Sequence, residues 1–142
     1  MRRLVAPLVL VLVLAACGSD GAPESFTDQP GALPASLTGY ARDLIGLADA
    51  DQVPLVQRNF LEGCMSGEAA RLQGLSGRSL ADACGCSYDS LVSYLIDNTT
   101  TELAAFELFV KIDQRVEDQT DDVDPIGSQY IDLFDTCRSQ AA

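Results

Sequence analysis

The stretch ADACGCSYDS, residues 81–90, places two cysteines one residue apart within a segment of helical periodicity. At about 100° of rotation per helical residue, Cys86 points about 200° away from Cys84. Cys84 lies on the apolar side of this predicted helix with Leu80 and Leu91, whereas Cys86 lies off that side. We therefore expect the two sulfurs to face different neighbours, one in the core and one elsewhere.

Four further segments show helical spacing, so the sequence predicts five helices after residue 36. Pro54 and Pro125 stand where a proline suits the first turn of the second and fifth segments. No segment shows the alternating apolar and polar residues of a strand over a useful length. The predicted class is therefore a small all-α domain over residues 37–142. The periodic residues are Leu37, Tyr40, Ala41, Leu44 and Ala48; Val53, Val56, Phe60 and Cys64; Leu80, Cys84, Leu91 and Leu95; Ala105, Phe109, Ile112 and Val116; and Ile126, Tyr130, Leu133, Phe134 and Cys137.

Two helix starts carry capping signals. The run Thr99-Thr100-Thr101-Glu102 is a capping-box arrangement, in which a hydroxyl and a carboxylate satisfy free amides at a helix start. Asp124 before Pro125 is a cap and first-turn pair for the last helix. The third helix is expected to run from about Ser79 to Asp97.

The N-terminus has the three-part layout of a secretory signal peptide, with arginines at residues 2–3 and an uncharged run over residues 4–16. This run is shorter than the about 20 residues that a membrane-spanning helix needs. It ends in Leu14-Ala15-Ala16-Cys17, which resembles the lipobox of bacterial lipoproteins. The resemblance implies that residues 1–16 are removed and that a diacylglycerol on the Cys17 thiol anchors the chain to the outer side of a cell membrane. An ordinary signal peptide, the alternative, does not account for a cysteine at this point.

Residues 17–36 are rich in Gly, Pro, Ser and Asp and show no apolar period. This composition is typical of a flexible linker. At about 5–6 Å per square root of residue number, such a tether would hold the domain about 25 Å from the bilayer. The predicted folded domain therefore begins at residue 37.

Four cysteines remain once Cys17 is assigned to the lipid: Cys64, Cys84, Cys86 and Cys137. An even number in a small exported domain indicates two disulfides, and three pairings are open. We favour Cys64 with Cys84 and Cys86 with Cys137, because a Cys84–Cys86 bridge would be cramped. Such long-range pairing does not suit a simple up-and-down bundle. Either the final helix crosses the others, or the loop at residues 117–124 runs back along the bundle.

The charge of the chain excludes some partners. Without the two leader arginines, seven basic residues remain against 21 acidic ones, a formal net charge of −14. Nucleic acid is not expected as a partner, because phosphate binding needs a basic surface. The excess of arginine over a single lysine is similar to that of actinomycete lipoproteins.

No pattern of catalytic or metal-binding residues is expected. Cys84-Gly85-Cys86 invites a redox or zinc interpretation, but its spacing differs from the two-residue gap of oxidoreductases. The acidic run at residues 117–124 misses the calcium-loop pattern, because Ile126 and Leu133 fall where oxygen ligands belong. The chain has no histidine, which removes the commonest general base. We expect no cofactor besides the covalent lipid.

The predicted function is a non-catalytic binding module that presents a helix face or groove to another protein of the cell envelope. An alternative is capture of a small apolar ligand in a pocket between helices. A third option is thiol-disulfide chemistry at Cys84 and Cys86, which requires that pair to reduce easily.

Overall fold

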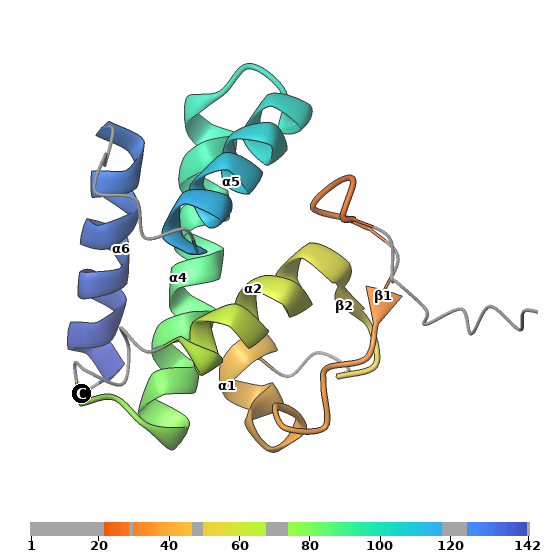
Figure 1. The fold of residues 1–142 in the computed structure, drawn as a ribbon, viewed down its shortest axis with the longest axis vertical. Coiled ribbons are helices and arrows are strands. Elements are labelled where there is room, and N and C mark those ends of the chain that lie inside the picture. Colours follow the sequence, from red (N-terminus) through yellow and green to blue (C-terminus); the bar gives the residue numbers. More distant parts are fainter. Residues whose placement is uncertain (1–21, 29, 47–49, 68–73, 118–124, 142) are drawn as a thin grey trace, which may run out of the picture.

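A computed structural model of the chain describes residues 22–28, 30–46, 50–67, 74–117 and 125–141. Within these ranges it contains five α-helices, one short 3-10 helix and one pair of two-residue strands (Figure 1), which confirms the predicted all-α class. The helices are η1 Thr38–Tyr40, α1 Ala41–Ile45, α2 Leu55–Ser66, α4 Gly77–Asn98, α5 Glu102–Glu117 and α6 Pro125–Ala141, and strand β1 Pro30–Gly31 pairs antiparallel with β2 Val53–Pro54. None of the described helices is long and apolar enough to cross a membrane.

Helix α4 is the longest described helix, with 22 residues, and it contacts α1, α2, α5 and α6. Figure 1 shows α6 beside α4 on one side of the domain and α1, α2 and the strands on the other. Because neighbours surround α4, side chains on several sides of it are buried. They include Ala81, Leu91 and Leu95 in the core cluster and Ser87 near α6.

The last helix runs opposite to α4. Cys137, near the end of α6, is bonded to Cys86 in the first half of α4. Gln129, near the start of α6, shares a surface depression with Tyr94, near the end of α4. The predicted long-range cross-link is thus satisfied by a final helix that lies against α4. The predicted return loop, residues 117–124, lies outside the described residues apart from Glu117.

Aromatic rings form the centre of the core. The ring centroids of Phe60 in α2, Tyr88 in α4 and Phe109 in α5 lie 5.5 to 5.8 Å apart. Phe26 packs edge-on against Phe106 at 5.4 Å and against Phe109 at 5.5 Å. Edge-to-face pairs at such distances add about 0.5–1.5 kcal/mol to the burial of the rings. The cluster joins three helices and the N-terminal segment into one core.

The prediction of a flexible tether up to residue 36 is wrong for its second half. Phe26 is 7% exposed and Leu33 is 5% exposed, and both belong to the core cluster. The Leu33 amide donates to the Ala50 carbonyl at 2.9 Å, close to the β1–β2 pair. The segment is polar on average, but full burial of one Phe or Leu is worth about 1.5–3 kcal/mol. The burial of Phe26 and Leu33 therefore attaches this segment to the core, although its sequence shows no periodic pattern.

Helix boundaries differ from prediction at three places. The first helix ends at Ile45, because Gly46 has a φ of +68° that stops the helix, and Ala48 lies outside the described residues. Val53 and Pro54 form β2, so the second helix begins at Leu55. The third helix begins at Gly77, two residues before the expected Ser79.

The cap of α5 is Thr101. Its hydroxyl accepts a hydrogen bond from the Ala104 amide at 3.1 Å. The Thr99 hydroxyl donates instead to the Leu95 carbonyl at 2.8 Å, which gives a hydrogen-bond partner to a carbonyl in the last turn of α4. The expected capping box, which pairs a threonine with Glu102 three residues later, is therefore wrong, because α4 extends to Asn98 and leaves only three residues for the turn.

Candidate functional site

The structure joins the four domain cysteines in two disulfides. Cys64 in α2 is bonded to Cys84 in α4, with Cα atoms 5.9 Å apart. Cys86 in α4 is bonded to Cys137 in α6, with Cα atoms 5.7 Å apart. This is the pairing that the sequence favoured, and both Cα separations lie in the usual range for a disulfide. The predicted lipid site, Cys17, lies outside the described residues.

Three consecutive residues of α4 contact three different helices. Cys84 bonds to α2 and Cys86 bonds to α6, while Gly85 between them meets α1. A Cβ atom at residue 85 would lie 2.6 Å from the Asp43 carbonyl oxygen and 3.1 Å from that of Leu44. Gly85 therefore allows the backbone of α1 to approach α4 closely at the residue between the two bonded cysteines. A glycine within a helical segment is the sequence signal that could have predicted this close packing.

The interpretation of Cys84 and Cys86 as one dithiol pair does not fit this geometry. Each sulfur is bonded to a different helix, about 200° apart around α4 by helical rotation. Cys84 is fully buried in the core, whereas Cys86 is half-buried. The two disulfides are therefore separate sites with different surroundings.

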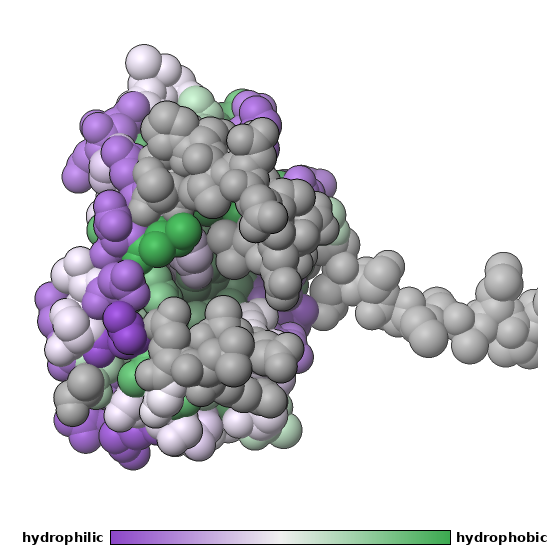
Figure 2. Space-filling view, turned by 60° about the vertical axis from the view of Figure 1, so that its left-hand side comes forward, coloured by the Kyte–Doolittle hydropathy of each residue, from purple (hydrophilic) through white to green (hydrophobic). Residues whose placement is uncertain are grey.

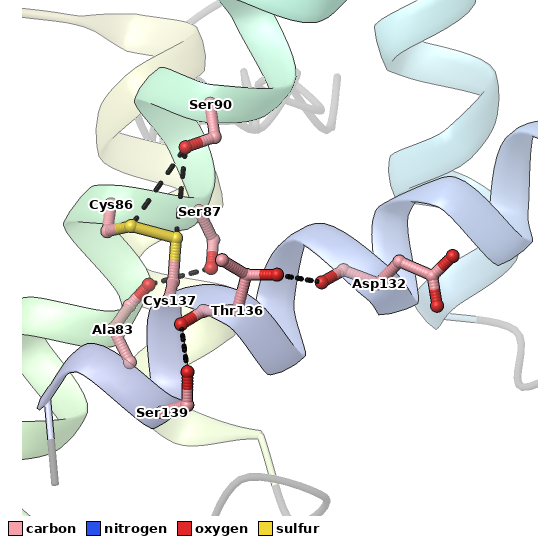
Figure 3. Close-up of a disulfide and its surroundings, with 8 residues drawn as sticks. All are labelled: Ala83, Cys86, Ser87, Ser90, Asp132, Thr136, Cys137 and Ser139. Atoms are coloured by element: carbon pink, nitrogen blue, oxygen red, sulfur yellow. Dashed lines mark hydrogen bonds between the residues drawn. A yellow bond between two sulfur atoms is a disulfide. The ribbon is translucent and has the colours of Figure 1, made fainter.

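The Cys86–Cys137 bond has small polar neighbours (Figure 3). The Ser90 Oγ atom lies 3.9 Å from the Cys86 sulfur and 3.8 Å from the Cys137 sulfur. A disulfide carries no hydrogen, so the serine hydroxyl is the donor, and its single proton can point to one sulfur or the other. The nearby Ser87 hydroxyl is buried and donates to the Ala83 carbonyl at 2.7 Å. Ser90 is thus the polar group in position to interact with either sulfur.

A shallow depression of about 190 Å³ lies between α4 and α6. It is open to solvent and smaller than the about 300–1,000 Å³ typical of a small-molecule pocket. Figure 2 shows the face of the molecule that carries α6, where apolar residues appear in a hollow beside a polar edge. The lining of the depression combines apolar and polar side chains: Tyr94, Gln129, Asp132, Leu133 and Thr136.

The perturbed titratable groups of the described residues are tyrosines and one aspartate. Burial, with a contribution from the Asp89 carboxylate, raises the pKa of Tyr88. Burial and the Asp113 carboxylate raise the pKa of Tyr130 to about 12. Burial also raises the pKa of Asp89. Both phenols are neutral near pH 7, and their rings pack against Phe60.

An ion pair ties α1 to the first turn of α4. The Arg78 guanidinium lies 3.0 Å from one Asp43 carboxylate oxygen, and the Asp43 side chain is only 10% exposed. Within the described ranges, no group of three or more Cys, Asp or Glu side chains could hold a metal ion. Residues 118–124 of the acidic run, whose calcium interpretation the sequence disfavoured, lie outside those ranges.

The fold and the cysteine pairing define a small all-α domain cross-linked by two disulfides through one central helix. Comparison of the chain with protein-family models, curated proteins and solved structures finds no match.

Proposed function

We propose that this chain is a lipoprotein, anchored by Cys17 to the outer side of a cell membrane, whose helical domain is a non-catalytic binding module for another envelope protein. The observation that supports the proposal is the pairing of the domain cysteines. All four cysteines of the domain are paired, which leaves Cys17 as the odd cysteine of the chain. Disulfides persist in exported proteins, and Cys17 stands where a lipobox places the acylated thiol.

The packed N-terminal segment shortens the proposed tether. Phe26 is in the core, so only nine residues lead from the lipidated Cys17 to the first anchored side chain. At about 3.3–3.6 Å per extended residue, the anchor would lie within about 32 Å of Phe26. We infer that the side of the domain that carries Phe26 faces the bilayer and that the α4–α6 face points away from it, since Figure 1 places α6 opposite the strands.

The charge of the domain indicates the chemistry of the partner. The mature chain would carry a net charge of −14, and the depression between α4 and α6 includes the exposed Asp132. A partner with a basic surface would be attracted, whereas anionic lipid head groups would be repelled. The proposed partner is therefore a protein with a basic patch that lies at a distance from the membrane surface.

Mass spectrometry of the protein extracted from membranes tests the lipid anchor. The expected product begins at Cys17 and carries a diacylglycerol, and it partitions into detergent. A Cys17→Ser variant is expected to lose the lipid and the detergent partitioning, whereas the control Ser19→Ala keeps both. An N-terminus other than Cys17 without a lipid would overturn the anchor proposal.

Photo-crosslinking from two exposed glutamines tests the binding face. Gln129 lines the depression between α4 and α6, and Gln52 lies beside β2 on the opposite side of the domain. A photoreactive residue at position 129 is expected to capture an envelope protein, and the same residue at position 52 is not. Equal capture from both positions, or none from position 129, would contradict the proposed binding face.

A further inference from the structure

The two disulfides differ in how their sulfurs are surrounded. Each bond joins a half-buried cysteine to a buried one: Cys64 to Cys84, which is 0% exposed and belongs to the apolar core cluster, and Cys86 to Cys137, which is 2% exposed. In the Cys86–Cys137 bond, Cys86 is half-buried, and the half-buried Ser90 lies within 3.9 Å of both sulfurs. A thiol can therefore approach either bond through its half-buried cysteine, and what distinguishes the second bond is a hydroxyl donor beside both of its sulfurs.

We propose that Cys86–Cys137 is a reducible site that exchanges with an external dithiol and thereby controls the attachment of α6. One thiolate of the dithiol attacks the Cys86 sulfur, and the bond to Cys137 breaks with the Cys137 sulfur leaving as a thiolate. The second thiol of the dithiol, as its thiolate, then attacks the mixed disulfide and releases Cys86. Two electrons and two protons pass to the protein, which holds two thiols, and the dithiol becomes a disulfide.

Ser90 assists the first step. The rate of exchange rises as the leaving thiolate becomes more stable. The Ser90 Oγ atom, 3.8 Å from the Cys137 sulfur, can donate a hydrogen bond to that thiolate. Attack at Cys64 would instead release the Cys84 thiolate. Both leaving sulfurs are buried, so desolvation disfavours either thiolate, and the Ser90 donor offsets part of this cost at Cys137. Exchange at Cys86–Cys137 is therefore expected to be the faster of the two.

The packing of α6 explains why this bond controls its attachment. The structure describes the side chains of α6 over residues 129–141. Of these, only Cys137 is buried, with an exposed fraction of 2%. Tyr130, Leu133 and Phe134 are only partly buried against the core. The side of α4 near the bond carries small residues, Ala83, Ser87 and Ser90, which offer little apolar area (Figure 3). Loss of the covalent bond thus removes the most buried contact of α6.

Release of α6 would uncover part of the aromatic core. Tyr130 of α6 packs edge-on against Phe60, with ring centroids 6.3 Å apart. Phe60, in α2, also contacts Tyr88 of α4 and Phe109 of α5, and neither of these contacts involves α6. The reduced protein is expected to keep this core, since Cys64–Cys84 still ties α2 to α4. It would expose an apolar surface that the oxidised protein covers.

Partial reduction of the purified full chain tests the exchange site. The protein is treated with dithiothreitol for increasing times, alkylated, and digested for mass spectrometry. Cys86 and Cys137 are expected to be alkylated about tenfold faster than Cys64 and Cys84. Hydrogen exchange of α6 is expected to rise after this step while the amides of α4 stay protected. Equal rates for both disulfides, or unchanged protection of α6, would overturn the proposal.

Two serine variants on α4 separate the role of Ser90 from a general effect on the helix. Ser90→Ala is expected to slow reduction of Cys86–Cys137 about threefold, because the leaving thiolate loses its donor. The exposed Ser93 is a matched control, and Ser93→Ala is expected to leave the rate unchanged. Identical rates in the two variants would refute the role of Ser90. None of these readouts involves Cys17, so the outcome is independent of the lipid-anchor proposal.

Discussion

Replacement of Gly85 by alanine is expected to destabilise the domain, although alanine is the better helix former. The added Cβ atom would lie 2.6 Å from the Asp43 carbonyl oxygen and 3.2 Å from the Leu44 Cα atom. Both are backbone atoms, so no side-chain rotation relieves the contact, and α1 must move away from α4. The movement would disturb Leu44, which is 1% exposed.

The magnitude follows from two opposing terms. Alanine gains about 1 kcal/mol over glycine within a helix. Overpacking against a fixed backbone costs about 1–3 kcal/mol, and partial exposure of a buried leucine costs up to about 1.5–3 kcal/mol more. The net loss is expected to be about 2 kcal/mol, which corresponds to a decrease in Tm of roughly 10 °C for a domain of this size.

Urea and thermal unfolding of the oxidised protein measure this loss. Gly63 in α2 is the matched control, since a Cβ atom there meets nothing within 4 Å. Gly63→Ala is expected to raise stability by up to about 1 kcal/mol through helix propensity alone. The reasoning about the α1–α4 contact would be refuted if Gly85→Ala were as stable as the unsubstituted protein or gained stability as Gly63→Ala does.

Three further substitutions test the core, the cap and the buried phenol. Phe26→Ala is expected to cost about 3 kcal/mol in urea unfolding, whereas Leu103→Ala, at a side chain 63% exposed, stays within about 0.5 kcal/mol; equal effects would contradict the packing of the N-terminal segment. Thr101→Ala is expected to cost about 1 kcal/mol by loss of the α5 cap, and the exposed Thr100→Ala to cost little; the reverse order would show that another threonine is the cap. Because folding raises the pKa of Tyr130 from 10.0 to about 12, the folded state disfavours the phenolate, and stability is expected to fall as the pH rises from 10 to 12. Tyr130→Phe is expected to remove part of that fall, as followed by thermal unfolding across this pH range, and an unchanged pH profile would show that Tyr130 does not titrate in this way.

Local sequence signals predicted much of the architecture. The helical periodicity of the third and fifth segments placed Leu91, Leu95 and Cys137 on buried faces, and the structure buries all three. The rotation between Cys84 and Cys86 predicted that they bond to different neighbours, as they do. These predictions succeed because the angle between residues of one helix is fixed by helix geometry.

The missed features depend on contacts between distant segments. Phe26 packs against Phe106, 80 positions later in the chain, and nothing in its polar sequence surroundings signals that burial. Thr99 and Thr101 are chemically identical candidates for a cap, and the choice between them depends on where α4 ends. For the candidate site, the position of Ser90 beside the Cys86–Cys137 bond follows only once the pairing is known.

The sequence by itself determined the helical class, the cysteines available for pairing and the resemblance of its N-terminus to a lipobox, because each depends on residues close together in the chain. Only the tertiary structure decided that Phe26 belongs to the core, that α1 and α4 approach each other closely at Gly85, and that Ser90 lies beside one of the two disulfides. These properties arise where surfaces from distant segments meet. Burial and close approach are set by all the packed neighbours at once, and no local pattern of residues encodes them.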